Sequence, residues 1–328
     1  MQGMKQWQET RTVFLELDQI LDQGHSACLA LLHSIKGSSF RRPGAKLLIR
    51  GDGSFVGNIS GGCLEEDLRE RAARCLANHQ TEPVHYDTSD DENNAWGLGL
   101  GCGGEVDITL YPITPALSNW VKTVLDRISQ EQTFSLGWNP TPASDETPAV
   151  LDPNPDGHFS LTEVITPPPR LILCGAGIDT EPLVAMGEAC GFRVTVIDHR
   201  KTYLDACRAG HKLARRPKEG LGDIDIDATT SVVVKMHALN MDREWATYFS
   251  TTHAGYVGLL GPGHRRDTIM QAIPSSAQCR FHGPAGLDIG GEGAEQMAVS
   301  ILAEILSYLN QRDAHALRKK TGPIHGKM

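Results

Sequence analysis

Two of the eight cysteines in this sequence lie in glycine-rich segments, where a thiol is open to a ligand. Cys63 follows Gly61 and Gly62 and stands at the start of a helical pattern whose first turn is acidic, with Glu65 as its first acid. Backbone N–H groups at a helix N-terminus bind anions and lower the pKa of a nearby thiol. This loop therefore either holds a ligand beside a reactive thiol or is a tight turn in which Cys63 is a buried filler.

Cys102 lies in a segment with five glycines among the eight residues 97–104. Gly103 and Gly104 follow it directly, so we expect an accessible thiol on a flexible loop. Such a thiol suits sulfur transfer, ligation of a soft metal or contact with a large cofactor. The alternative is a glycine-rich turn with an incidental cysteine.

The stretch 169–200 predicts a strand, a glycine turn, a helix and a second strand. The apolar run Leu171–Cys174 is the first strand, Thr180–Ala189 has helical spacing, and Phe192–Ile197 is the second strand. A unit of this order and of about thirty residues is typical of the Rossmann fold. We therefore expect a Rossmann-like parallel-sheet domain in the second half of the chain.

In this unit Gly175 permits the tight turn, and Gly177 lets a ligand approach the helix N-terminus. Asp198 ends the second strand, where an acid can accept hydrogen bonds from a ribose. The dinucleotide fingerprint is incomplete, because Thr180 occupies its third glycine position and Asp179 would repel a pyrophosphate. The alternative is a Rossmann unit whose glycines serve only the turn.

Three further residues in the second half are candidates for ligand contact. His237 follows a predicted strand at Ser231–Lys235, so it would lie at the carboxyl edge of the sheet, where ligands bind. Arg265 follows a glycine turn and suits a phosphate or another anion, and Asp288 lies in a glycine-rich loop. The competing interpretations are that His237 is a structural histidine, that Arg265 is a solvated residue at a helix start and that Asp288 caps a turn.

The elements that would position these residues follow from hydrophobic periodicity and turn residues. In the first half we expect helices at 5–22, 63–77 and 120–128, and strands at 26–35, 46–49, 54–56, 83–86 and 106–113. We expect an N-terminal α/β domain at 1–138, a Pro- and Asp-rich linker at 139–166, the Rossmann-like domain at 167–311 and a basic, disordered tail at 312–328.

Composition narrows the classes of function. A formal charge of −9 argues against nucleic acid or an anionic membrane as the main partner. We find no apolar run long enough for a membrane span and no signal-peptide core, so we expect a cytoplasmic protein. The sequence has no CxxC, HExxH or Walker A motif. Four cysteines fall in apolar patterns and are expected in the core: Cys28, Cys75, Cys174 and Cys190.

Several short stretches occur in a distinctive order: Gly37–Ser39, Arg42–Ala45, Ser60–Glu65, Gly101–Gly104, Gly175–Gly177, Asp198–Arg200, Tyr256–Gly261, Gly286–Gly290 and Ala298–Glu304. This ordered set resembles the xanthine dehydrogenase accessory protein family of the XdhC/CoxI type, over about residues 24–306. The resemblance implies a carrier of molybdenum cofactor and not an enzyme. It also implies that the carrier protects the cofactor during sulfuration and delivers it to a molybdenum hydroxylase.

On this resemblance, a cysteine desulfurase is a partner, the protein is a homodimer, and Cys63 and Cys102 contact the molybdenum or its sulfur. The alternatives are an NAD(P)-binding oxidoreductase that uses the Rossmann domain and a scaffold that only docks partner proteins. The residues expected to bind the cofactor are Arg42, Gly61, Gly62, Cys63, Glu65, Cys102, Gly103, Gly104, Gly175, Gly177, Asp198, His237, Arg265 and Asp288.

Overall fold

The computed structural model describes residues 4–37, 39, 41–87, 104–143, 146–222 and 224–321. The chain divides into two compact units, which we call the N-terminal unit (Lys5–Pro167) and the C-terminal unit (Pro168–Lys319). Both combine helices with β-sheets, which confirms the α/β class expected from the sequence. In the part of the chain that is described, no helix is long and apolar enough to cross a membrane.

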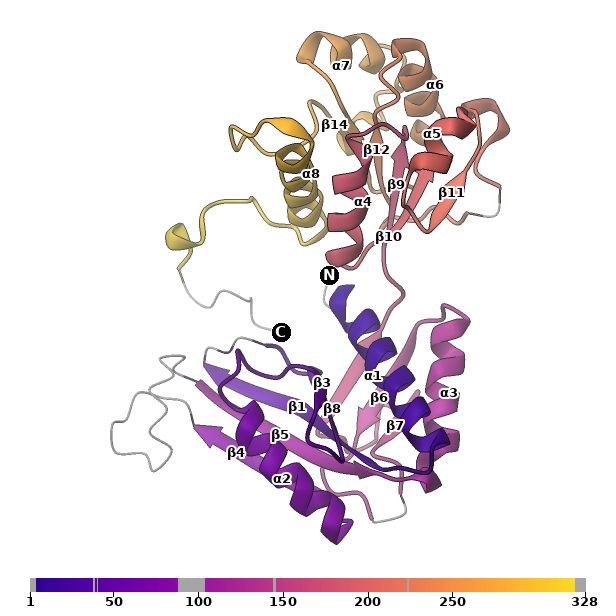
Figure 1. Ribbon diagram of the computed structural model, residues 1–328. Helices are drawn as coiled ribbons and strands as arrows, with labels where there is room; N and C mark the ends of the chain where they lie inside the picture. Colours follow the sequence, from indigo (N-terminus) through magenta and orange to yellow (C-terminus); the bar gives the residue numbers. More distant parts are fainter. Residues whose placement is uncertain are drawn as a thin grey trace. The chain divides into compact units, whose positions relative to one another are not determined.

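The N-terminal unit is built on a five-stranded antiparallel sheet with the order β3-β2-β1-β5-β4 (Figure 1). Its strands are β1 (Ala27–Gly37), β2 (Lys46–Arg50), β3 (Phe55–Gly57), β4 (Glu82–Asp87) and β5 (Gly104–Ile113). The first seven residues of β1 are all buried, because both faces of the sheet are covered. This central strand pairs with β2 on one side and with β5 on the other.

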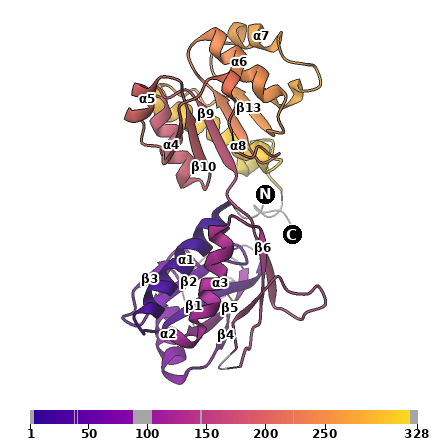
Figure 2. The same cartoon turned by 90° about the vertical axis from the view of Figure 1, so that its right-hand side faces the viewer.

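Helices cover the two faces of this sheet (Figure 2). The helices of the unit are α1 (Met4–Asp22), α2 (Glu65–Asn78) and α3 (Ser118–Ser129), with a 3₁₀ turn, η1, at Pro115–Leu117. One apolar core joins α2 to the sheet through Leu68, Ala72 and Cys75. A second core joins α1 and α3 to the opposite face, where Phe14 and Trp120 have ring centroids 5.2 Å apart.

A small antiparallel sheet completes this second core. Its order is β7-β6-β8, with β6 (Phe134–Trp138), β7 (Ala149–Leu151) and β8 (Leu161–Ile165). The segment 139–166, expected to be a linker, thus supplies two strands that pair with β6. Its proline and aspartate residues mark the turns between these strands, whereas β8 alternates buried and exposed residues as a half-buried strand does.

A buried ion pair links the small sheet to the large one. The Lys46 Nζ lies 2.8 Å from the Glu163 Oε1, and their side chains are 0% and 3% exposed. Lys46 also donates to the Gly44 carbonyl, and the Trp138 indole donates to the Glu163 Oε1 at 2.9 Å. Because a buried charge is costly without a partner, these contacts fix how β8 lies against β2.

His33 is a second buried polar residue of the N-terminal unit. Its Nε2 lies 3.0 Å from the Tyr111 hydroxyl, and its Nδ1 lies 2.7 Å from the Ser160 Oγ. The Tyr111 hydroxyl also donates to the Asn139 carbonyl at 2.9 Å, and the Ser160 hydroxyl donates to the Trp138 carbonyl at 3.0 Å. Burial lowers the pKa of His33 from 6.5 to about 4, although the nearby Asp107 opposes the shift.

The C-terminal unit contains a six-stranded parallel sheet with the order β11-β10-β9-β12-β13-β14. Its strands are β9 (Arg170–Cys174), β10 (Arg193–Ile197), β11 (His211–Leu213), β12 (Ser231–Val234), β13 (Tyr256–Leu259) and β14 (Phe281–His282). The predicted Rossmann-like domain is therefore confirmed. The chain moves outward from β9 in one direction and returns to its other side as β12, which makes the β9–β12 boundary the topological switch point.

Helices cover both faces of the parallel sheet, as the buried runs in its strands require. The helices are α4 (Thr180–Ala189), α5 (Lys201–Ala206), α6 (Leu239–Ser250), α7 (Gly263–Met270) and α8 (Gly293–Leu309), with 3₁₀ turns η2 (Pro217–Glu219), η3 (Gln278–Arg280) and η4 (Leu317–Lys319). One core contains α4, α5 and α8, and the other contains α6 and α7. In Figure 1 α4 and α8 lie side by side.

We predict that Lys46→Met lowers the free energy of unfolding by about 3–5 kcal/mol, because it leaves the Glu163 carboxylate buried without its counter-charge. Adding Glu163→Gln should recover part of this loss, since the amide is neutral and can still accept from Trp138. Urea unfolding measures both effects. Lys36→Met is the control, because the Lys36–Glu105 pair is exposed. An equal loss in the Lys46→Met and control variants would contradict the prediction.

His33 should make the stability of the fold depend on pH. The pKa of His33 is depressed in the folded protein, so the unfolded chain binds more protons between pH 6.5 and about 4. Stability should therefore fall as the pH decreases through this window, by up to roughly 3 kcal/mol from this group. His33→Gln should flatten the dependence measured by urea unfolding, whereas exposed His25→Gln should not. A His33→Gln profile as steep as that of the wild type would refute this assignment.

Candidate functional site

The loops that carry the N-terminal candidate residues start from one end of the five-stranded sheet. At this end Gly37 of β1 pairs with Gly104 of β5, and Asp87 of β4 pairs with Glu105. The loop after β3, which contains Cys63, follows Gly57, which pairs with Leu47 near the start of β2. The turn between β1 and β2 and the loop after β3 therefore lie at the same end of the sheet.

Hydrogen bonds fix the loop that presents Cys63. The Ser60 Oγ accepts from the backbone N–H groups of Gly62, Cys63 and Leu64, at 3.1, 2.9 and 3.1 Å. These N–H groups thus have a partner within the loop before any ligand arrives. This network ends the loop at Leu64, so α2 begins at Glu65. We expected from the sequence that this helix begins at Cys63.

Glu65 also stabilises this loop through hydrogen bonds to its carboxylate. Its buried carboxylate accepts from the N–H groups of Ile59 and Ser60, at 3.4 and 2.9 Å, and from the Ser60 hydroxyl. Burial alone raises the pKa of Glu65, but the hydrogen bonds from Ser60 and the backbone outweigh it and lower the pKa. We infer that Glu65 shapes the thiol loop and does not face a ligand.

The thiol of Cys63 is exposed, as are Gly61 and Gly62. It is therefore not the buried filler of the alternative interpretation. Of the four cysteines expected in the core, Cys28, Cys75 and Cys174 are buried and Cys190 is half-buried. Burial raises the pKa of the Cys28 and Cys174 thiols, which keeps them protonated. No group of three or more metal-ligating His, Cys, Asp or Glu residues occurs among the described residues.

Two arginines lie in the turn between β1 and β2. Arg42 is exposed. Arg41 is held by Glu9 and by Asn58, which precedes the thiol loop, so this side chain ties the turn to that loop. Cys102 and Gly103 lie outside the described residues, whereas Gly104 is the buried first residue of β5.

The glycine turn of the C-terminal unit is closely packed. Gly175 has a φ of +123°, and a Cβ at this position would lie 2.4 Å from the Lys235 carbonyl oxygen. Only glycine fits here, because the loop after β9 passes directly against the end of β12. A Cβ on Gly177 would lie 2.6 Å from the Asp179 Oδ1. Gly175 therefore has a local structural role, whereas at Gly177 the nearby atom is the end of a side chain.

Asp198 is fully buried and already has hydrogen-bond donors. Its carboxylate accepts from the Ala176 N–H at 2.9 Å, and Arg200 contributes its backbone N–H at 2.8 Å and its guanidinium at 2.7 Å. Burial alone raises the pKa of Asp198, but the hydrogen bonds from Arg200 and Ala176 lower it. The side chain joins the ends of β9 and β10 and is not directed toward a ribose.

Lys235 was not among the residues expected from the sequence, although its side chain is buried where the loop after β9 meets the end of β12. Its ammonium group is 0% exposed and lies 2.8 Å from the Asp179 Oδ1 and 2.7 Å from the Thr180 Oγ1. It directly follows the apolar strand β12, and a lysine at the end of such a run is the sequence signal that points to it. Burial lowers the pKa of Lys235, and Asp179 opposes the shift.

Of the other three candidates, His237 alone lies beside this ion pair. Its Nε2 is 3.1 Å from the Asp179 Oδ2, and its φ of +57° is uncommon for a residue with a side chain. Arg265 is paired with the buried carboxylate of Asp242, which also accepts from the Met236 N–H at 2.8 Å. Asp288 is exposed in the loop before α8.

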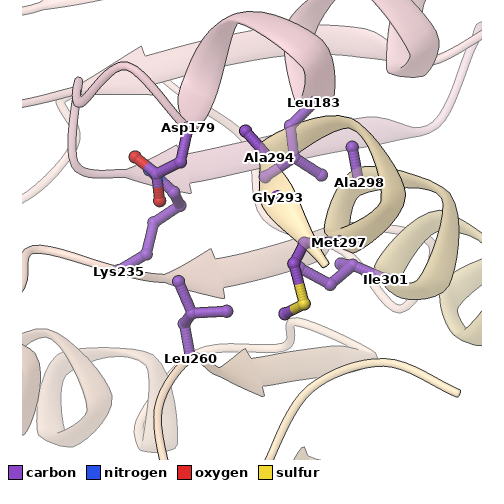
Figure 3. Close-up of a pocket in the computed structure, with 9 residues that line it drawn as sticks. All are labelled: Asp179, Leu183, Lys235, Leu260, Gly293, Ala294, Met297, Ala298 and Ile301. Carbon is purple, nitrogen blue, oxygen red and sulfur yellow. The ribbon is translucent and has the colours of Figure 1, made fainter. Parts of the chain in front are cut away.

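A pocket of about 240 Å³ opens beside the Lys235–Asp179 pair (Figure 3). Its wall is mainly apolar and comes from α4, α8 and the end of β13. The lining residues are Asp179, Leu183, Lys235, Leu260, Gly293, Ala294, Met297, Ala298 and Ile301. The pocket lies at the switch point of the sheet, where ligands of such folds bind.

Comparison with known proteins identifies the family. A model of the XdhC and CoxI family matches residues 20–87, and a model of the XdhC Rossmann domain matches residues 171–305, together more than half of the chain. The chain belongs to the XdhC/CoxI family. The family resemblance seen in the sequence is thus confirmed, and the second match covers the sheet that contains the switch point.

Two similar proteins have names that bear on function. A Bacillus subtilis protein named as a probable xanthine dehydrogenase subunit is 29% identical over 317 residues, which cover 88% of this chain and 95% of the relative. The molybdenum cofactor insertion chaperone PaoD from Escherichia coli is 24% identical over 90% of this chain and 88% of its own.

A solved structure shows the same fold. A crystal structure described as a xanthine dehydrogenase from Bacillus halodurans matches with a TM-score of 0.77 and 26% identity. The match covers 92% of this chain and 97% of the other. Both units of this protein therefore have a counterpart in a known structure.

We predict that Gly175→Ala lowers the free energy of unfolding of the C-terminal unit by roughly 1–3 kcal/mol, because the new Cβ meets the Lys235 carbonyl and forces a positive φ on alanine. Thermal unfolding followed by circular dichroism measures the loss. Gly210→Ala is a matched control, since a Cβ there meets nothing within 4 Å. Equal stability of the Gly175→Ala and Gly210→Ala variants would show that the glycine turn is not constrained.

Proposed function

We propose that this protein binds molybdenum cofactor and inserts it into a molybdenum hydroxylase of the xanthine dehydrogenase class. Two relatives that match nearly the whole chain support this proposal, because one is a molybdenum cofactor insertion chaperone and the other is named as part of a probable xanthine dehydrogenase. The cofactor is thus a cargo that the protein receives and releases, and the protein itself is a carrier and not an enzyme.

The exposed thiol of Cys63 is the observation that carries the proposal. Thiolates are preferred ligands of soft metals and also accept or pass on sulfur. The loop around it is already fixed by Ser60 and Glu65, so little conformational entropy is lost when a ligand binds. The exposed Gly61 and Gly62 leave room for a bulky cargo to approach the sulfur.

In this proposal Cys63 and Cys102 hold the molybdenum or its sulfur, and Gly103, Gly104 and Arg42 complete the contact. Arg42 offers positive charge to the anionic cargo. The cargo is protected here while a cysteine desulfurase supplies the sulfur for its terminal ligand. We further propose that the protein acts in the cytoplasm and that it is a homodimer. Light scattering of the purified protein tests the oligomeric state.

The alternative, an NAD(P)-dependent oxidoreductase, has less support. In the Rossmann fold the acid after the second strand accepts hydrogen bonds from the ribose of the dinucleotide. Here the carboxylate of that acid, Asp198, is fully buried and bound by Ala176 and Arg200. The negative charge of Asp179 lies at the N-terminus of α4, where a pyrophosphate would bind.

We predict that the purified protein retains molybdenum and pterin after incubation with molybdenum cofactor and gel filtration. Cys63→Ala should reduce the retained molybdenum by at least about tenfold, because it removes a metal ligand. Elemental analysis and pterin fluorescence after oxidation measure metal and pterin separately.

Cys279→Ala is the matched control, since Cys279 is an exposed cysteine of the C-terminal unit. It should retain as much molybdenum as the wild type. Unchanged retention in a Cys63→Ala/Cys102→Ala double variant would remove the thiolates from the proposal. NAD(P)H binding without cofactor retention would favour the oxidoreductase.

A further inference from the structure

The pocket beside Lys235 and Asp179 has no role in the thiol chemistry proposed for the N-terminal unit. Its volume of about 240 Å³ is below the roughly 300–1,000 Å³ of pockets that hold drug-sized ligands. It therefore suits one small ring system and is too small to enclose a dinucleotide. Leu183, Leu260 and Met297 line it, so the body of the ligand should be apolar or aromatic on its faces.

Asp179 gives the pocket one specific polar edge. An ionised carboxylate has about four lone-pair sites, two on each oxygen. In Asp179 one oxygen accepts from Lys235 and the other accepts from His237. Each oxygen thus keeps capacity for one more hydrogen bond, and the side chain is 30% exposed.

The charge state of Asp179 supports its role as an acceptor. Burial alone raises its pKa, but Lys235 and His237 outweigh burial and hold the pKa below its ordinary value. The carboxylate is therefore ionised at neutral pH. Because Lys235 balances this charge, the pocket favours a neutral ligand with two adjacent N–H donors over a cation or an anion.

We propose that this pocket binds the 2-amino-4-oxopyrimidine edge of a fused heterocycle, with Asp179 accepting from the ring N–H and from the amino group. A pterin carries this edge, and so does guanine. The inference deepens the proposed function and rests on it, because the cargo proposed above contains a pterin. Met297 and Leu183 pack against the ring faces, and Lys235 holds Asp179 in place.

Fluorescence titration of the full-length protein with pterin and with lumazine tests the proposal. Lumazine has the same fused rings but an oxygen where pterin has the amino group, so it presents an acceptor to Asp179. Because the lost donor leaves this carboxylate site unpaired, lumazine should bind roughly 5–160-fold more weakly. Guanosine monophosphate is the third probe. Tighter binding of pterin assigns the pocket to the cargo, and tighter binding of the nucleotide assigns it to guanine.

Met297→Trp should abolish binding of pterin by filling the pocket, without removing the Lys235–Asp179 pair. Val299→Trp is the matched control, because Val299 lies on the same helix and is 47% exposed. Both variants are first checked for wild-type thermal unfolding. Equal affinity for pterin and lumazine, no measurable binding of any probe, or full binding by Met297→Trp would overturn the inference.

Molybdenum retention separates this inference from the proposed function. If the wild type retains molybdenum through Cys63 but binds none of the three probes in the pocket, only the pocket inference fails. If pterin binds in the pocket but the protein never retains molybdenum, the carrier function fails and the pocket assignment stands.

Discussion

The burial of the Lys235 ammonium group is the constraint on which the arrangement of α4 and β12 in the C-terminal unit depends. A buried charge must have a counter-charge and hydrogen-bond acceptors nearby. Asp179 and Thr180 supply these contacts, and both lie at the start of α4. The glycine turn must therefore bring the start of α4 against the end of β12, which leaves no room for a side chain at Gly175.

The N-terminal unit meets a similar constraint with Lys46 and Glu163. This pair joins the large sheet to the last strand of the unit, more than one hundred residues later in the sequence. Within this framework a smaller network shapes the thiol loop. Ser60 and Glu65 satisfy the backbone of this loop, so Cys63 is presented by a structure that exists before ligand binding.

These features divide the proposed chemistry between the units. The N-terminal unit offers a soft sulfur ligand on an exposed, rigid loop. The C-terminal unit retains the Rossmann architecture, but Asp198 joins strand ends and Asp179 pairs with lysine. Its switch-point pocket therefore suits recognition of a ring edge better than transfer of hydride from a dinucleotide. A cofactor carrier needs binding contacts of this kind but no catalytic group.

The sequence alone determined the α/β class, the Rossmann unit around Gly175 and Gly177, and the family. These follow from periodicity, glycine spacing and motif order, which are local properties of the chain. It did not reveal β7 and β8, because short strands between proline-rich turns have little pattern of their own.

Only the tertiary structure decided which polar residues line the pocket and which are held in contacts within the fold. Asp198 and Arg265 have the residue types of ligand contacts, yet their partners are Arg200 and Asp242. Lys235 belongs to the pocket because α4 and α8 pack beside β12. The Arg265–Asp242 and Lys235–Asp179 pairs join residues that are 23 and 56 positions apart in the sequence, so no local pattern of residues predicts these pairs.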